Sequence, residues 1–254
     1  MNYRSQLLLL TLFFFFCGFL PAEAKRASTL DIGKGSATIS YLKGSAEILE
    51  PGTGPWTPLK LQDVLEEGDQ VRTKAEAQME LVLADNSRLR FAGNSEFRVV
   101  RMEAGGPSTP RDVNVHVTLG KAWASVSKTM GTKGNFAVSC DRAVAGVRGT
   151  VYRMNVEPDR SALVRVYDGT VHVTGGGKAM ALPTPPVGPP TRVAGPKPIP
   201  GPHKVTMEEW TVIIKAMQQV KVGADGVPGK PRDFTEKEDR DEWVEWNKAR
   251  DREI

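Results

Sequence analysis

Apolar and polar residues alternate with a period of two through residues 28–182, and turn residues interrupt this alternation at intervals of about eight to twelve positions. This pattern is typical of strands that bury one face and expose the other. It predicts strands at 37–41, 46–49, 78–83, 87–91, 97–101, 113–119, 122–127, 135–140, 151–156, 162–167 and 170–174. We therefore expect an all-β main domain of about ten to twelve strands, arranged as a sandwich or as a short solenoid.

Residues 183–202 interrupt the β pattern with a dense run of prolines. Proline lacks a backbone donor and fixes φ, so such a run forms neither a helix nor a central strand. It favours an extended, polyproline-like linker, with a ligand for a proline-recognising module as the alternative. The sequence thus predicts a main domain at 28–182, a linker at 183–202 and a separate segment at 203–254.

The segment 203–254 is predicted to contain two α-helices. Thr206 and Glu209 have the spacing of a capping box, an apolar stripe follows at helical spacing, and Gly223 is the expected stop. A second capping box, Thr235 to Glu238, is expected to open a charged helix with two tryptophans on one side. The apolar positions dock either on the β domain or on a partner. They supply the candidate partner-binding residues Trp210, Ile213, Ile214, Met217, Trp243 and Trp246.

Residues 1–24 have the form of a cleaved secretory signal. Arg4 provides a positive start, residues 7–20 are almost entirely apolar, and Ala22-Glu23-Ala24 is a small-x-small cleavage site. The apolar run is shorter than the roughly 20 residues needed to span a membrane, and an uncleaved anchor is the alternative. We expect a periplasmic or extracellular protein without a transmembrane anchor after cleavage. Cleavage would leave Cys140 as the only thiol, so no internal disulfide is expected.

The search for catalytic and metal-binding motifs argues against an enzyme. Gly93 to Phe97 lacks the second glycine of a nucleophile elbow, and Gly175 to Ala179 lacks the features of a phosphate-binding loop. The histidines His116, His172 and His203 lie far apart, with no ligands at metal-binding spacing. The sequence therefore predicts no catalytic residues, no metal and no cofactor.

Charge is distributed unevenly along the chain. Residues 25–202 carry 23 Lys and Arg against 17 Asp and Glu, whereas 203–254 carry 10 against 12. A net charge of +6 on the first part is compatible with anionic envelope polymers, although a solvated surface is the simpler interpretation. The basic residues are scattered and do not form one patch with aromatic residues, and export also argues against a nucleic-acid partner.

Six segments, in order along the chain, resemble the FecR domain, an envelope β-module best known from the outer part of transmembrane anti-sigma regulators. They are Trp56-Thr-Pro-Leu59, Gly68-Asp-Gln-Val-Arg-Thr73, Met79 to Leu89, Leu119-Gly-Lys-Ala-Trp123, Phe136-Ala-Val138 and Val147-Arg-Gly-Thr150. The third departs from the family's Asp-Gly-Ser hairpin by having Asn86, which also tolerates positive φ. Arg148 is either an exposed contact for an anion or a brace for the turn at Gly149.

The resemblance implies a FecR-like β fold, and the absence of a recognisable anti-sigma segment leads us to expect a stand-alone exported member. The leading hypothesis is a non-enzymatic envelope protein whose β domain binds or scaffolds a protein or a cell-wall polymer. The alternative is a soluble periplasmic component of a signal-transduction system that contacts a membrane regulator or an outer-membrane receptor.

Overall fold

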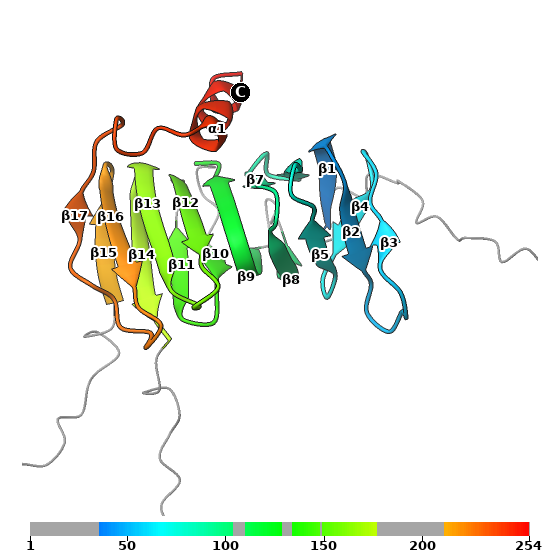
Figure 1. Ribbon diagram of the computed structural model, residues 1–254, viewed down its shortest axis with the longest axis horizontal. Helices are drawn as coiled ribbons and strands as arrows, with labels where there is room; N and C mark the ends of the chain where they lie inside the picture. The colour runs from blue at the N-terminus through cyan, green and yellow to red at the C-terminus, as the bar shows by residue number, and fades with distance from the viewer. Residues whose placement is uncertain (1–35, 104–109, 129–133, 148, 177–210, 254) are drawn as a thin grey trace, which may run out of the picture.

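The computed structural model describes residues 36–103, 110–128, 134–147, 149–176 and 211–253. The predicted signal peptide at 1–24 and linker at 183–202 lie outside these ranges. The described residues form seventeen strands and one helix (Figure 1). The elements are β1 Ser36–Lys43, β2 Ala46–Leu49, β3 Thr57–Pro58, β4 Val64–Glu66, β5 Gln70–Thr73, β6 Gln78–Leu83, β7 Arg88–Phe91, β8 Glu96–Glu103, β9 Arg111–Ser125, β10 Gly134–Ser139, β11 Ala143–Val147, β12 Val151–Val156, β13 Ala162–Asp168, β14 Thr170–Gly175, β15 Thr211–Lys215, β16 Gln218–Val222, β17 Arg232–Asp233 and α1 Glu242–Asp251.

The strands form two layers that share one long strand. Sheet A has the order β4-β1-β6-β7-β9-β12-β13-β16-β17. Sheet B has the order β3-β2-β5-β8-β9-β10-β11-β14-β15. Within the described residues all pairings are antiparallel except that of β9 with β10. All seventeen strands are thereby linked in one hydrogen-bonded network.

Strand β9 passes from one layer to the other near Gly120. Its first part pairs with β8 and β10 in sheet B, and its last six residues pair with β7 and β12 in sheet A. Gly120 has a φ of 99°, and a Cβ at this position would lie 2.3 Å from Ser95 Oγ. Only glycine fits both the backbone conformation and the close approach, which explains why the change of layer occurs here.

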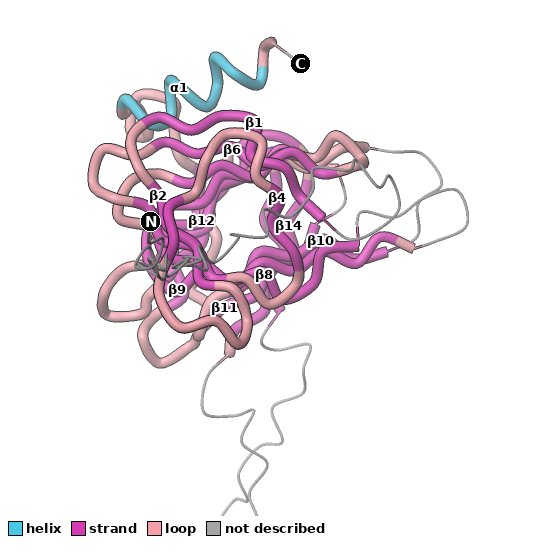
Figure 2. Tube along the Cα trace, turned by 90° about the vertical axis from the view of Figure 1, so that its right-hand side faces the viewer, coloured by secondary structure: helices cyan, strands magenta, loops and turns pink. Residues whose placement is uncertain are grey.

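The core lies between the two layers and is built from the inward positions of nearly every strand. Phe91 on β7 and Phe97 on β8 stack across it, with ring centroids 3.7 Å apart. Figure 2 views the molecule from its end and shows the two layers, with α1 outside the layer that contains β1 and β6. The prediction of an all-β main domain is confirmed, and of the two architectures left open the strands form the sandwich.

The predicted helix with the apolar stripe from Met207 to Val220 is wrong over its described part. Residues 211–222 form the hairpin β15–β16, which joins β14 in sheet B and β13 in sheet A. Ile214 is buried in the core, whereas the adjacent Ile213 is 52% exposed, as expected when successive side chains point to opposite faces. The unpaired edges of β13 and β14 supply backbone hydrogen-bond partners for these residues, which favours strands over a helix. This long-range pairing cannot be read from the local spacing of apolar residues. Residues 206–210 of the predicted stripe lie outside the described ranges.

The second predicted C-terminal helix is present as α1 but begins later than expected. Thr235 and Glu238 exchange the predicted reciprocal bonds, from Thr235 N to Glu238 Oε2 at 2.9 Å and from Glu238 N to Thr235 Oγ1 at 3.3 Å. These bonds close a turn, and the helix itself starts after Asp241, whose carboxylate accepts from Val244 N at 2.7 Å. Among the described residues, no helix has the length and apolar character needed to span a membrane.

Candidate functional site: a charged ladder beneath the C-terminal segment

A row of large polar and aromatic side chains crosses the outer face of sheet A. The residues lie opposite one another in the strand register, so that each is a direct neighbour of the next. We refer to this row as the ladder. It consists of Tyr41 on β1, Glu80 on β6, Arg90 on β7, Trp123 on β9, Arg153 on β12, Arg165 on β13 and Gln219 on β16.

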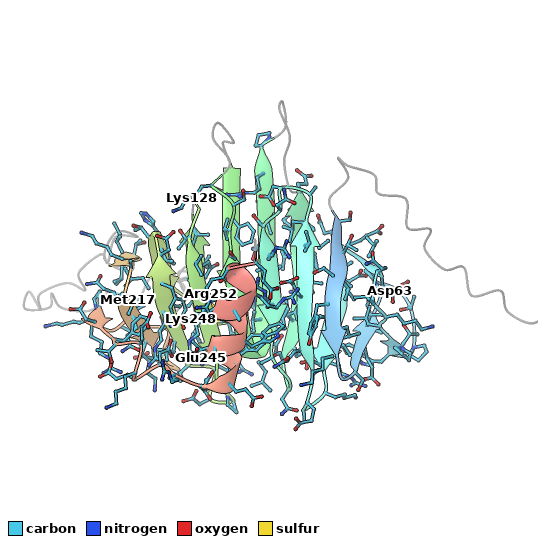
Figure 3. The ribbon with its side chains drawn as sticks, turned by 90° about the horizontal axis from the view of Figure 1, so that it is seen from above. Asp63, Lys128, Met217, Glu245, Lys248 and Arg252 are labelled. Atoms are coloured by element: carbon cyan, nitrogen blue, oxygen red, sulfur yellow. The ribbon has the colours of Figure 1, made fainter. Side chains whose placement is uncertain are left out.

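Residues 234–253, which we call the C-terminal segment, cover the ladder. Figure 3 looks onto this face of the sheet, with Glu245 and Lys248 of α1 and its C-cap Arg252 lying over the strands. Arg90, Trp123 and Arg153 are almost completely buried, although they occupy outward positions. Two carboxylates of the segment, Asp239 and Asp251, make its main contacts with the ladder.

Asp239 precedes α1 and binds the part of the ladder formed by β12 and β13. Its carboxylate accepts hydrogen bonds from the guanidinium groups of Arg153 and Arg165 and from the hydroxyl of Tyr167. Arg165 also donates to Gln219 Oε1 at 2.7 Å. Burial, as the largest cause, raises the pKa of Tyr167, so its hydroxyl keeps its proton and remains a donor to Asp239.

Glu80 anchors the other half of the ladder and is completely buried. It accepts from Arg90 Nε at 2.5 Å, from Arg88 Nη1 at 3.1 Å, from Ser40 Oγ at 2.8 Å and from Arg250 Nη2 of the C-terminal segment at 2.9 Å. Burial by itself would raise the pKa of this carboxyl. The hydrogen bonds from Arg250, Arg90 and Ser40 together outweigh burial and lower the pKa from 4.5 to about 2.

The end of α1 closes the site through Asp251 and an aromatic contact. Asp251 accepts from Arg90 Nη1 at 2.6 Å and from Trp123 Nε1 at 2.9 Å. Trp246 packs against Tyr41 with ring centroids 5.4 Å apart and stacks on Trp243 at 5.1 Å. The C-terminal segment therefore binds the sheet mainly through charged hydrogen bonds, supplemented by aromatic packing.

Positive charge exceeds negative charge in this network. Five guanidinium groups, those of Arg88, Arg90, Arg153, Arg165 and Arg250, meet three carboxylates. Three buried N–H groups of the ladder face, Arg88 Nε, Arg90 Nη2 and Arg153 Nε, have no protein acceptor. The ladder therefore offers more donors than the C-terminal segment uses.

A pocket of about 300 Å³ adjoins the ladder at the N-terminus of α1. Its lining includes Lys43, Gln78 and Lys121 from the sheet, together with Asp241 and Trp243 from the C-terminal segment. Lys121 lies two residues before Trp123 on β9, and hence on the same face of sheet A as the ladder. The pocket therefore lies at the edge of the buried network and is open to solvent.

The residues that the sequence analysis proposed for partner binding are not gathered in one place. Arg148 and Trp210 lie outside the described residues. Ile214 belongs to the core, Ile213 is exposed on β15, and Met217 forms the β15–β16 turn at a φ of 62°. Trp243 and Trp246 lie together on α1 and contact the ladder region. The ladder itself was missed, because polar outward positions in strands read as a solvated face.

A second polar cluster lies on the outer face of sheet B. Ser139 Oγ donates to Asn114 Oδ1 at 2.9 Å and lies 3.4 Å from His116 Nδ1, while His116 Nε2 lies 3.2 Å from Asp141 Oδ1. The residue types are those of a catalytic triad. However, the serine proton is directed to Asn114, and a serine nucleophile needs a base that accepts this proton. The nearer acceptor of the Ser139 hydroxyl is therefore Asn114, not His116.

The thiol and the potential metal ligands are the other candidates for chemistry. Cys140 is a buried free thiol, and burial raises its pKa, which disfavours the reactive thiolate. Among the described residues, no group of three or more His, Cys, Asp or Glu side chains is arranged to bind a metal ion. The fold and the buried ladder define a β-sandwich that carries a short segment of its own chain on one face.

Comparison with known proteins finds a family match over part of this sandwich. Residues 69–172 match the family model described as FecR protein. The predicted FecR resemblance is thereby confirmed for a region that runs from β5 into β14 and includes Glu80, Arg90, Trp123, Arg153 and Arg165. The C-terminal segment lies outside the matched region.

Two crystal structures of a candidate anti-sigma factor from Parabacteroides distasonis ATCC 8503 are similar to this chain. Each has 14% sequence identity and a TM-score of 0.42, and the similarity covers 65% of this chain. This chain spans 59% of the length of those proteins. Among curated proteins, no sequence matches this chain.

Proposed function

We propose that this protein is a non-enzymatic binding module of the cell envelope, exported by residues 1–24, whose FecR-like sandwich binds a protein partner at the ladder. The single observation that carries this proposal is the mode of contact already present within the chain. A short peptide segment lies across six strands and is recognised by buried arginines, a glutamate and aromatic rings.

The geometry supports a protein ligand over a cell-wall polymer. Asp239 and Asp251 each contact two or more defined donors, and the ring of Trp246 packs against that of Tyr41 in a tilted arrangement. Such paired, partly aromatic contacts require a ligand with carboxylates at fixed positions. A charged polymer would instead associate through scattered, solvent-exposed basic residues, and salt would release it.

The FecR match favours a signalling role for such binding. In this second form of the proposal, the protein is a soluble periplasmic component that contacts a membrane regulator or an outer-membrane receptor. Both forms place the ladder at the contact with another protein, so the same experiment addresses them and the identity of the captured partner separates them.

Site-resolved photo-crosslinking in cells tests the proposal on the full-length chain. One variant carries the photoreactive residue in place of Lys121, which lines the pocket at the rim of the ladder. The matched control carries it in place of Leu61, which is 54% exposed in the loop between β3 and β4, the strands at the edge opposite β17 and β15. We expect a discrete protein adduct from position 121 alone.

Two results would overturn the proposal. An adduct of equal yield from both positions would show that the ladder face is not the contact surface. Recovery of cell-wall material alone, released by salt, would assign the function to polymer binding by the basic β domain.

A further inference from the structure

We propose that residues 234–253 are a built-in occupant of the ladder, which a partner segment of the same chemistry displaces. This inference rests on the proposed function and names the ligand class. The external ligand is an acidic peptide segment with two carboxylates about twelve residues apart and an aromatic residue between them, as Asp239, Trp246 and Asp251 are arranged here.

The composition of the interface makes the C-terminal segment exchangeable. Four apolar side chains attach it, those of Phe234, Trp243, Val244 and Trp246, while its central contacts are ion pairs. The attraction within a buried ion pair is largely offset by the cost of removing both charges from water. Release of the segment exposes one aromatic cluster of the sheet, around Trp123 and Tyr167, beside charged groups that water solvates.

The unused donors of the ladder favour a more acidic competitor. Four guanidinium groups of the sheet, those of Arg88, Arg90, Arg153 and Arg165, share Glu80 and the two carboxylates that the segment supplies. N–H groups of Arg88, Arg90 and Arg153 lack protein acceptors. An external segment with a further carboxylate near these groups would form charge-assisted bonds that the C-terminal segment does not form. The internal segment has the advantage of its covalent link through residues 223–233, which keeps its local concentration high.

The connection to the sandwich is weak enough to let the segment leave. Between β16 and α1 the only strand is β17, whose two residues Arg232 and Asp233 pair with β16. Release of residues 234–253 leaves the pairings of β13 with β16 and of β14 with β15 intact. The ladder is thus uncovered without disturbing either sheet.

Peptide binding to the full-length protein tests this inference. The probe is a fluorescent synthetic peptide with the sequence of residues 234–253, and binding is measured by fluorescence anisotropy. We expect weak binding to the wild-type chain, because its own segment competes. The full-length variant Asp239→Asn, whose own segment is loosened, should bind the same peptide at least about tenfold more tightly.

Peptide variants separate specific from general electrostatic binding. The peptide with Asp251→Asn should bind Asp239→Asn protein about tenfold more weakly than the unmodified peptide, because it loses the bonds from Arg90 and Trp123. The control peptide with Glu245→Gln loses the same charge at an exposed position that pairs only with Arg240, and its affinity should be unchanged. Equal weakening by both substitutions would overturn the inference.

Two further outcomes are decisive. If Asp239→Asn does not fold, as judged by circular dichroism, the full-length variant Asp251→Asn opens the other end of the segment and is expected to show the same gain. Failure of folded, opened variants to bind the peptide refutes the inference. If the peptide binds but no adduct forms at position 121 in cells, the displacement of residues 234–253 is supported and the proposed function of binding a protein partner at the ladder is refuted.

Discussion

Glu80→Gln removes the charge at the centre of one half of the ladder while nearly preserving side-chain size. Four side chains donate to this buried carboxylate, among them Arg90, whose own side chain is completely buried, and Arg250 of the C-terminal segment. Breaking a buried ion pair by removing one partner typically costs about 3–5 kcal/mol. We expect the free energy of unfolding to fall by roughly 3 kcal/mol at neutral pH.

The pKa of Glu80 leads to the same magnitude and adds a pH dependence. The folded-state pKa of about 2 lies below the ordinary value of 4.5. This difference corresponds to roughly 3 kcal/mol of stabilisation. Because the folded pKa is lowered, the stabilisation is fully present above about pH 4.5 and is lost as the pH falls toward 2. The stability difference between wild type and Glu80→Gln should therefore fall below half its neutral value by about pH 3.

Urea unfolding of both proteins at neutral pH and at about pH 3 measures this difference. Far-ultraviolet circular dichroism reports the sheets. Tryptophan fluorescence reports all five tryptophans of the chain, of which Trp123, Trp243 and Trp246 lie at the site. The control Glu67→Gln makes the same change in an exposed pair, 3.2 Å from Arg101, and should cost less than about 1 kcal/mol. A loss for Glu80→Gln no greater than the control's, or one that is the same at both pH values, would refute the reasoning.

Three other predictions concern the hairpin, two glycines and the segment. Ile214→Ala should lower the free energy of unfolding in urea titrations by about 2–5 kcal/mol, and Ile213→Ala by less than about 0.5 kcal/mol. In a helix with both residues on the apolar stripe, the two substitutions would have similar costs. Gly93→Ala places a Cβ 1.8 Å from a backbone oxygen and should abolish soluble expression, whereas Gly146→Ala meets nothing closer than 3.9 Å and should express normally. Trp123→Phe removes a 2.9 Å bond to α1 and should speed hydrogen exchange in α1 severalfold, leaving the core strands unchanged.

Ten strands of the main domain could be predicted because each carries its own signal, although the two predicted strands 113–119 and 122–127 are one strand, β9. The strands β3, β4, β5 and β11 were not predicted. Most of the ten predicted strands have alternating apolar residues bounded by turn residues, as in Gln78–Leu83 and Ala162–Asp168. The hairpin β15–β16 lacks such a boundary. Its turn contains Met217 at a φ of 62°, a conformation that costs a residue with a side chain about 1–2 kcal/mol and that no sequence rule expects for methionine. Pairing with β13 and β14 compensates for this cost, and that pairing is not a local property.

The ladder could not be predicted because its residues are ordinary in their local context. Arg90, Arg153 and Arg165 each occupy an outward strand position, where a charged residue is normally solvated. Their burial depends on Asp239 and Asp251, which lie many residues later in a segment that reads as a charged, solvated helix. To predict the ladder, one would need the register of seven strands and the docking position of a distant segment. Neither follows from the periodicity of the sequence.

The position of the C-terminal segment has a consequence for how the protein is made. Every ladder residue, from Tyr41 to Gln219, precedes residues 234–253 in the chain and is therefore synthesised first. The newly formed sandwich thus passes through a state in which its future contact face is open to water. An apolar face would make that intermediate prone to aggregate, but a row of arginines with a glutamate stays hydrated and repels other copies. A contact face built mainly from charged residues therefore limits aggregation of the sandwich before residues 234–253 have docked on it.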